Sequence, residues 1–245
     1  MNGERNNYWF NAGVALAIGL VISSLIFGWF FAKSKKGDEA IAVTGSARKR
    51  IKSDLVVWSA GVTYQAPKLA DAYRSLSESV PRVRQYLVSK GIPEEQITVS
   101  SISTTPLRKT DENGQDSSEI TGYSLRQNLE VRSNDVDKIA QIAREATELI
   151  NQDILIESNA PQYFYTKLGD LKIEMLGEAA RDAKTRAEKI ASSTGNNIGA
   201  VRSARMGVMQ ITAADSTEVS DMGISDTSTI DKDITAVVNI SFSVD

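Results

Sequence analysis

The chain opens with a long apolar run. Residues 9–32 read WFNAGVALAIGLVISSLIFGWFFA and contain no charged side chain, and Lys33, Lys35 and Lys36 follow within four positions. A helix of this length crosses a hydrocarbon core of about 30 Å. Aromatic residues stand at both ends of the run, where they suit the headgroup level. We therefore predict a transmembrane helix at 9–32, preceded by a short tail (1–8) and followed by a linker (33–40).

A cleaved signal peptide is the alternative interpretation of this run. Signal peptides have a basic start, an apolar core of about 7–15 residues and small residues at the cleavage site. Arg5 is the only basic residue before the run, Glu4 offsets it, and the run is longer than such a core. The segment Ala32-Lys33-Ser34 is a weak match to a cleavage site. The pattern favours a retained anchor.

From Ile41 onward, apolar and polar residues alternate in the way that is typical of β-strands. Residues 41–64 alternate with period two around Ser53 and Asp54, which predicts a β-hairpin. The buried face of its second strand is predicted to carry Val56, Trp58, Ala60, Val62 and Tyr64. Further strands are predicted at 96–105, 120–132, 154–164, 199–211 and 234–244.

Apolar residues at helical spacing predict three helices between these strands. The first runs from Pro67 to Gly91, and Pro81 should kink or split it. Its stripe is Leu69, Tyr73, Leu76, Val80, Val83 and Leu87. The second spans 135–151, with Asn134 as its N-cap. The third spans 169–194 and ends at Gly195, with a stripe formed by Ile173, Leu176, Ala180, Ala183, Ala187 and Ile190.

The alanine-lined half of the third helix must approach its partner closely, and Asp182 should pair with Arg186 on its outer side. The order of elements predicts an α+β fold in which helices pack on one side of antiparallel sheets. This fold is assigned to one domain at 41–245, preceded by the single transmembrane helix. The sequence has no Walker loop and no G-x-G-x-x-G motif.

The amino-acid composition excludes several classes of partner and catalytic site. The net charge of −3 and the pI near 5.3 argue against a nucleic-acid partner, because phosphate binding requires a basic face. The chain has neither histidine nor cysteine. Zinc sites, thiol nucleophiles, Ser-His-Asp triads and thiolate clusters all need one of the two. We therefore predict no catalytic residue, no cofactor and no metal site.

Basic residues near the apolar run are candidates for binding lipid headgroups. They are Lys33, Lys35, Lys36, Arg48, Lys49, Arg50 and Lys52. A solvated strand face is an equal alternative, because alternation places Arg48, Arg50 and Lys52 on one side.

An acidic, apolar-poor segment separates the last two predicted strands. Its carboxylates are Asp215, Glu218, Asp221, Asp226, Asp231 and Asp233. They lack the spacing of a calcium-binding loop, so we predict a mobile, solvated loop.

Four segments resemble a known family: VTGSARKRIKSDLVVWSAGV, YLVSKGIPEEQITVSSIST, ITGYSLRQNLEV and GEAARDAKTRAEKIASSTGNNIGAV. They are similar to the SIMPL domain family of bacterial envelope proteins, a group that includes periplasmic immunogenic proteins, from Ile41 to the C-terminus. The resemblance implies an exported α+β domain, which assembles into homo-oligomeric rings in some members and is linked to oxidative stress in others. It implies no catalytic residue. This chain departs from secreted relatives in its long N-terminal span.

Together these features favour a membrane-anchored, homo-oligomeric scaffold or binding module without catalysis. A carboxylate-based hydrolytic enzyme and an adaptor for a membrane protein are the alternatives. The lysines after the span place the domain in the cytoplasm by the positive-inside rule, whereas the resemblance places it outside. We predict the periplasmic or extracellular side. The sequence leaves the ligand and the number of subunits open.

Overall fold

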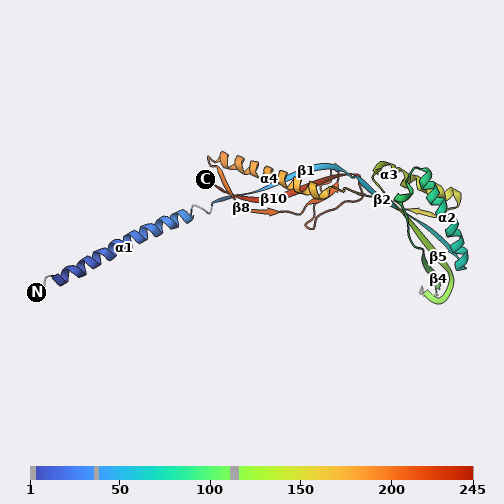
Figure 1. Cartoon of the computed structure of the whole chain (residues 1–245), viewed down its shortest axis with the longest axis horizontal. Helices are drawn as coiled ribbons and strands as arrows, with labels where there is room; N and C mark the ends of the chain where they lie inside the picture. The colour runs from blue at the N-terminus through green and yellow to red at the C-terminus, as the bar shows by residue number, and fades with distance from the viewer. Residues whose placement is uncertain (1–3, 36–38, 111–115, 245) are drawn as a thin grey trace. The chain divides into compact units, whose positions relative to one another are not determined.

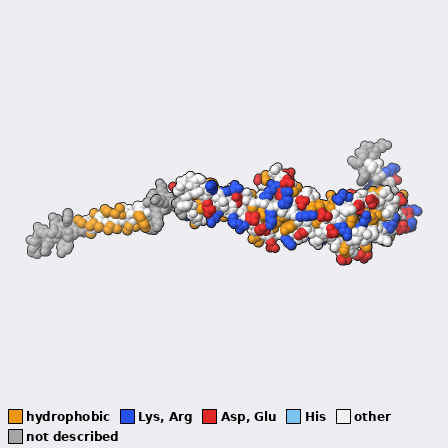
Figure 2. Space-filling view, turned by 90° about the horizontal axis from the view of Figure 1, so that it is seen from above, with side chains coloured by type: hydrophobic (Ala, Val, Ile, Leu, Met, Phe, Trp, Pro, Cys, Tyr) orange, Lys and Arg blue, Asp and Glu red, His pale blue; other side chains and the backbone are white. Residues whose placement is uncertain are grey.

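The structure is a computed structural model that describes residues 4–35, 39–110 and 116–244 (Figure 1). Helix α1 (Glu4–Lys35) is longer at both ends than the predicted segment 9–32. Its stretch Ala12–Trp29 has a mean hydropathy of 2.1 and none of its residues is buried. Figure 2 shows this stretch covered with apolar side chains and free of charged ones. By length and composition, it is able to cross a membrane.

The chain divides into two compact units. The first comprises residues 1–47, 176–207 and 237–245, and the second comprises residues 48–175 and 208–236. Strands β1 (Ala40–Lys52) and β10 (Asp231–Val244) and helix α4 (Leu168–Ser193) each contribute residues to both units. The units are described separately below.

The second unit contains a six-stranded antiparallel sheet. Its main path is β3 (Ile97–Val99), β5 (Asp116–Ser133), β2 (Leu55–Ala66) and β6 (Ile156–Ser158). Strand β4 (Ser103–Thr110) also pairs with β5, and β7 (Gln162–Phe164) pairs with β2. Helices α2 (Leu69–Ser89) and α3 (Val136–Glu145) pack against this sheet, together with the 3₁₀ segment η2 (Ala146–Gln152). A short 3₁₀ turn, η1 (Glu94–Gln96), leads into β3.

One face of this sheet forms the core. Alternate residues of β2 point into it, and Val56, Trp58, Ala60 and Val62 are completely buried, as predicted. Trp58 lies opposite Val131 of β5, so the two strands share the same buried face. Side chains of both helices fill the space above that face, including Leu76 and Ile139. The predicted arrangement of helices on one side of an antiparallel sheet is therefore confirmed.

The first unit contains parts of β1, β10 and β8 (Ile198–Met206), which pair in that order. Helix α4 contacts β1 at Gly45. A Cβ atom on Gly45 would overlap the backbone oxygen of Ala179 and would lie 2.6 Å from the Cβ of Ala183. The close approach predicted for the alanine-lined half of α4 is confirmed. The predicted outer pair also forms, with Arg186 Nε 2.9 Å from Asp182 Oδ2.

The predicted hairpin at 41–64 is wrong. Strands β1 and β2 are both present, but β1 pairs with β10 and β2 pairs with β5. The backbone at the predicted turn bonds to distant segments: Ser53 N donates to Ile230 O at 2.9 Å, and Asp54 N donates to Phe164 O at 3.0 Å. With these bonds, the backbone at Ser53 and Asp54 connects a strand of one sheet to a strand of the other and does not form a hairpin turn.

Several element details also differ. Helix α4 buries the row Leu171, Met175, Ala179, Ala183, Ala187 and Ala191. Ile173 and Ile190, predicted in its stripe, are 73% and 49% exposed. In α2 the stripe begins at Ala72, whereas Leu69 and Tyr73 are exposed, and Pro81 does not divide the helix.

The ends of other elements differ as well. Asp135, not Asn134, caps α3 by accepting a hydrogen bond from Lys138 N. Three predicted strands are each divided in two. They are 96–105 (β3 and β4), 154–164 (β6 and β7) and 199–211 (β8 and β9, Gln210–Ala213).

Candidate functional site

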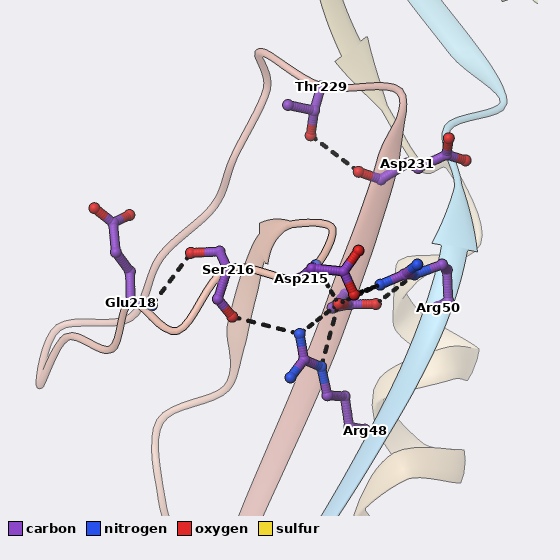
Figure 3. Close-up of polar contacts among 8 residues, drawn as sticks. Arg48, Arg50, Asp215, Ser216, Glu218, Thr229 and Asp231 are labelled. Carbon is purple, nitrogen blue, oxygen red and sulfur yellow. Dashed lines mark hydrogen bonds and ion pairs between the residues drawn. The ribbon is translucent and has the colours of Figure 1, made fainter.

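A cluster of charged side chains lies between β1 and β10 in the second unit (Figure 3). Arg48 and Arg50 alternate along β1, and both donate hydrogen bonds to the same residue of β10, Asp233. Arg50 Nε is 3.0 Å from Asp233 Oδ1, and its Nη2 is 3.0 Å from Oδ2. Arg48 Nη2 and Nε are 2.5 and 3.2 Å from Oδ2. Two guanidinium groups therefore bind one carboxylate.

The turn that follows β9 adds a third segment to this cluster. Asp215 has a φ of +63°, a left-handed conformation that aspartate tolerates better than most residues. Its backbone nitrogen donates to Asp233 Oδ2 at 2.9 Å, and its carboxylate accepts a hydrogen bond from Arg50 Nη2 at 2.5 Å. Arg48 Nη2 also reaches the backbone oxygen of Ser216 at 3.4 Å. The cluster thus fixes the start of the loop after β9.

Asp233 is held in its ionised form. Its side chain is 3% exposed, whereas those of Arg48 and Arg50 are about half exposed. The hydrogen bonds from Arg50 lower the pKa of Asp233 most strongly; burial opposes them, and the Asp215 amide and Arg48 add to the lowering. A carboxylate that accepts this many donors is a poor general base. The role of Asp233 is therefore structural.

A second ion pair, between Asp226 and Lys232, is more deeply buried. Lys232 Nζ is 2.9 Å from Asp226 Oδ2, and the two side chains are 2% and 13% exposed. Asp226 also accepts hydrogen bonds from the backbone and hydroxyl groups of Ser228 and Thr229. Burial alone would raise the pKa of Asp226, but these hydrogen bonds and Lys232 hold it well below its usual range. This pair closes the C-terminal end of the same loop.

The acidic segment is therefore not uniformly solvated. The expectation of a solvated loop is wrong for Asp226 and Asp233, which are shielded from solvent and bonded on several sides. Asp215, Glu218, Asp221 and Asp231 are exposed. Among the residues that the structure describes, no group of three or more acidic side chains is arranged to hold a metal ion.

Each candidate lipid-binding residue of β1 has an acidic partner. Besides the two arginines, Lys49 Nζ is 2.6 Å from Glu174 Oε1, and Lys52 Nζ is 2.9 Å from Asp137 Oδ2. A lipid phosphate would have to compete with these carboxylates. Lys36 lies outside the described residues, as do the side chains of Lys33 and Lys35. Headgroup binding by these seven residues remains a prediction, which liposomes of anionic and neutral lipid would test.

An open groove of about 450 Å³ lies beside β2 and β6 in the second unit. Its lining includes the exposed apolar side chains of Ile150 and Leu155. Glu157 also lines it, but this carboxylate is ion-paired with Arg126 at 2.6 Å. The groove therefore does not bring together two free carboxylates, as a hydrolytic acid/base pair would require.

One signal in the sequence pointed to the structural role of Asp233. Lys232 and Asp233 stand next to the apolar strand pattern ITAVVNI, and charged residues at such positions need partners when the strand is buried. Their partners could not be read from the chain, because Arg48 and Arg50 lie more than 180 positions away.

Comparison with known proteins gives the family. The SIMPL family, described as proteins of unknown function (DUF541), matches residues 41–242. The 26 kDa periplasmic immunogenic proteins of Brucella melitensis and Brucella abortus are each 25% identical over 166 residues. Each match covers 66% of this chain and 64% of the relative's length. An amidase of the hydantoinase/carbamoylase family from Burkholderia multivorans aligns with 49% of this chain and 28% of its own at 14% identity. Its TM-score of 0.24 does not indicate a shared fold.

The family match extends from β1 to near the end of β10, and it therefore includes the charged cluster and helices α2, α3 and α4, but not α1. The periplasmic relatives and the apolar N-terminal helix are both compatible with a location in the cell envelope. Since the family match covers most of its residues, the chain belongs to the SIMPL family.

Proposed function

We propose that this protein is a membrane-anchored, self-assembling scaffold or binding module of the cell envelope, without catalysis of its own. The observation that carries the proposal is the stretch Ala12–Trp29 of α1, which has no charge and no buried residue. An exposed, uncharged stretch of 18 residues with this hydropathy is costly in water and favourable in a bilayer. The helix is retained as an anchor.

Strand β8 supports the assembly part of the proposal. It is the last strand of the path β1–β10–β8, so its outer edge has no strand beside it in the described structure. From Ala200 to Met206 its residues are exposed on both faces. A long, exposed edge strand readily associates with another chain. The neighbour is a second copy of this protein.

The charged clusters support a structural role over an enzymatic one. Among the carboxylates of the described residues, Asp233 and Asp226 have the pKa values that are shifted most, and both are shifted downward by hydrogen bonds and cations. A general acid near neutral pH needs the opposite shift. These carboxylates stabilise the loop between β9 and β10.

The soluble part lies outside the cytoplasmic membrane. This placement follows the periplasmic relatives. The lysines after the span favour the cytoplasmic side by the positive-inside rule, and the proposal gives them less weight. Protease treatment of intact spheroplasts tests it. Digestion of the soluble part without lysis is the expected result, and protection until lysis would reverse the topology.

Measurement of mass tests self-assembly. The full chain, extracted in mild detergent, should give particles larger than one protomer plus its micelle, and their fraction should increase with protein concentration. A constant monomer mass would contradict the assembly. Co-purification of a different chain in fixed proportion would favour an adaptor instead.

Extraction of the chain from membranes by alkaline carbonate would contradict the anchor.

A further inference from the structure

The first unit carries an exposed strand edge, that of β8, which combines apolar and basic side chains. Val201 and Met206 of β8 are 57% and 66% exposed. They lie opposite Phe242 and Val238 of β10, which are buried. The two side chains therefore continue the buried face of the sheet beyond the part that is covered.

Two arginines accompany these apolar side chains. Arg202 and Arg205 of β8 are exposed, and neither forms an ion pair within the described part of the chain. In contrast, the four cations of β1 from Arg48 to Lys52 are all ion-paired. Arg205 pairs with the exposed Asn239 and projects from the other face of the sheet than Met206, so these residues meet only along the free edge of β8. We call Val201, Arg202, Arg205 and Met206, which line this edge, the β8 patch. It has two positive charges and no negative one.

The second unit carries a patch of the opposite charge, on the loop between β9 and β10. Val219 and Met222 are 82% and 93% exposed, which is unusual for apolar side chains in an ordered loop. Glu218 and Asp221 flank them, and neither carboxylate forms an ion pair within the described residues. Figure 3 shows the Glu218 side chain pointing away from Arg48 and Arg50. These four residues form the loop patch.

The loop patch is held in position by the rest of the second unit. Gln210 Nε2 donates to Ser220 O at 2.7 Å, and Ile211 N donates to Ile224 O at 2.8 Å. The Asp233 cluster fixes the start of the loop, and the buried pair of Asp226 and Lys232 fixes its end. A loop that is already ordered loses little conformational entropy when it binds.

We propose that the loop patch of one copy binds the β8 patch of a second copy. The argument rests on charge complementarity: two unpaired carboxylates with two exposed apolar side chains match two unpaired guanidinium groups with two exposed apolar side chains. Each copy carries one patch of each kind, so the contact is heterologous and is repeated from copy to copy. The inference rests on the proposed self-assembly and names the surfaces that produce it.

Charge reversal on the full chain in detergent tests the contact. Arg202→Glu with Arg205→Glu should weaken self-association at least about tenfold, because each new carboxylate would face another. Glu218→Arg with Asp221→Arg should weaken it to a similar extent. All four changes together should restore association. The matched control is Lys68→Glu, just before α2, with Arg74→Glu on α2, which reverses two exposed charges outside both patches and should leave self-association unchanged.

Cross-linking provides a measurement that does not depend on affinity. Since the chain has no cysteine, single variants Met206→Cys and Met222→Cys carry unique thiols. Two differently tagged chains, one with each variant, should form a mixed dimer with a short bismaleimide linker. Ile173→Cys, which is 73% exposed in the native protein, replaces Met222→Cys as the control and should yield far less mixed product.

The outcomes separate this inference from the proposed function. Self-association that survives charge reversal, or mixed product no greater than with Ile173→Cys, would overturn the contact while leaving self-assembly intact. A full chain that stays monomeric at every concentration would overturn both. Circular dichroism and melting temperature confirm that each variant is folded before it is compared.

Discussion

Arg50 binds Asp233 with two hydrogen bonds of equal length, one from Nε and one from Nη2, each 3.0 Å. This bidentate geometry matches the planar guanidinium to the planar carboxylate. The same carboxylate also accepts hydrogen bonds from Arg48 and from the backbone of Asp215. One side chain of β10 thereby connects β1 with the loop after β9.

The substitution Asp233→Asn should destabilise the protein. It removes the charge that two arginines and one backbone amide share, and hydrogen bonds to a charged group contribute about 1.5–3 kcal/mol. We expect the free energy of unfolding to decrease by about 2 kcal/mol in urea denaturation. Asp221→Asn, on the same loop but without an ion pair, is the control and should lie within about 0.5 kcal/mol of the parent. Equal losses for the two variants would contradict a special role for Asp233.

Acid should weaken the protein through the two buried carboxylates. The folded state lowers the pKa of both Asp226 and Asp233 below the unfolded value of about 3.9. A lowered pKa contributes stability that is fully present above the unfolded pKa and is lost as the pH falls through that value toward the folded pKa. The free energy of unfolding should therefore decrease steadily below about pH 5.

Asp226→Asn isolates one of these contributions. The variant cannot take up the proton, so its free energy of unfolding should decrease less steeply with falling pH than that of the parent. It should also be less stable at neutral pH, because it leaves the Lys232 ammonium buried without its carboxylate. Parallel pH curves for the two proteins would show that Asp226 is not held in its ionised form by folding.

The substitution Gly45→Val should disrupt the packing of α4 on β1. Even a Cβ atom at this position overlaps backbone atoms of α4, and backbone cannot move aside as a flexible side chain would. We expect a loss of at least about 1–3 kcal/mol, measured by thermal unfolding of the full chain in detergent. Gly169→Ala is the control, since a Cβ there has no neighbour within 4 Å and alanine favours the helix. A melting temperature unchanged by Gly45→Val would contradict the close contact.

A charge in the middle of α1 should prevent stable insertion. Leu20→Arg places a guanidinium within the stretch Ala12–Trp29, at a cost of about 2.5–3.5 kcal/mol on insertion scales. We expect a smaller fraction of the protein to resist alkaline carbonate extraction. Leu20→Ile keeps the apolar character and should behave as the parent. Equal retention of the two variants would indicate that this helix does not hold the protein in the membrane.

Local patterns in the sequence were sufficient for most individual elements. The alternation of β2 identified its buried face, since side chains of a strand alternate between the two faces whatever the strand pairs with. The glycines at 91 and 195 identified the ends of two helices, and both have positive φ angles. The uncharged run identified α1, because no other segment of the chain approaches its length and hydropathy.

The register of α4 shows where such patterns fail. The predicted stripe passes through Ile173 and Ile190, two large apolar residues, yet both are exposed. The buried row begins with Leu171 and Met175 and continues through small residues, from Ala179 to Ala191. The strand that α4 covers has a glycine at the crossing point, so close backbone approach outweighed the burial of larger side chains.

By itself, the sequence determined the long apolar helix, the α+β class and the absence of histidine and cysteine chemistry, because each depends on composition or on neighbours within a few positions. The tertiary structure alone decided the partner of β1, the role of Asp233 and the exposure of the two patches. Strand pairing and ion pairing join residues that are far apart along the chain, as Arg48 and Asp233 are, and local periodicity contains no information about which distant groups will meet.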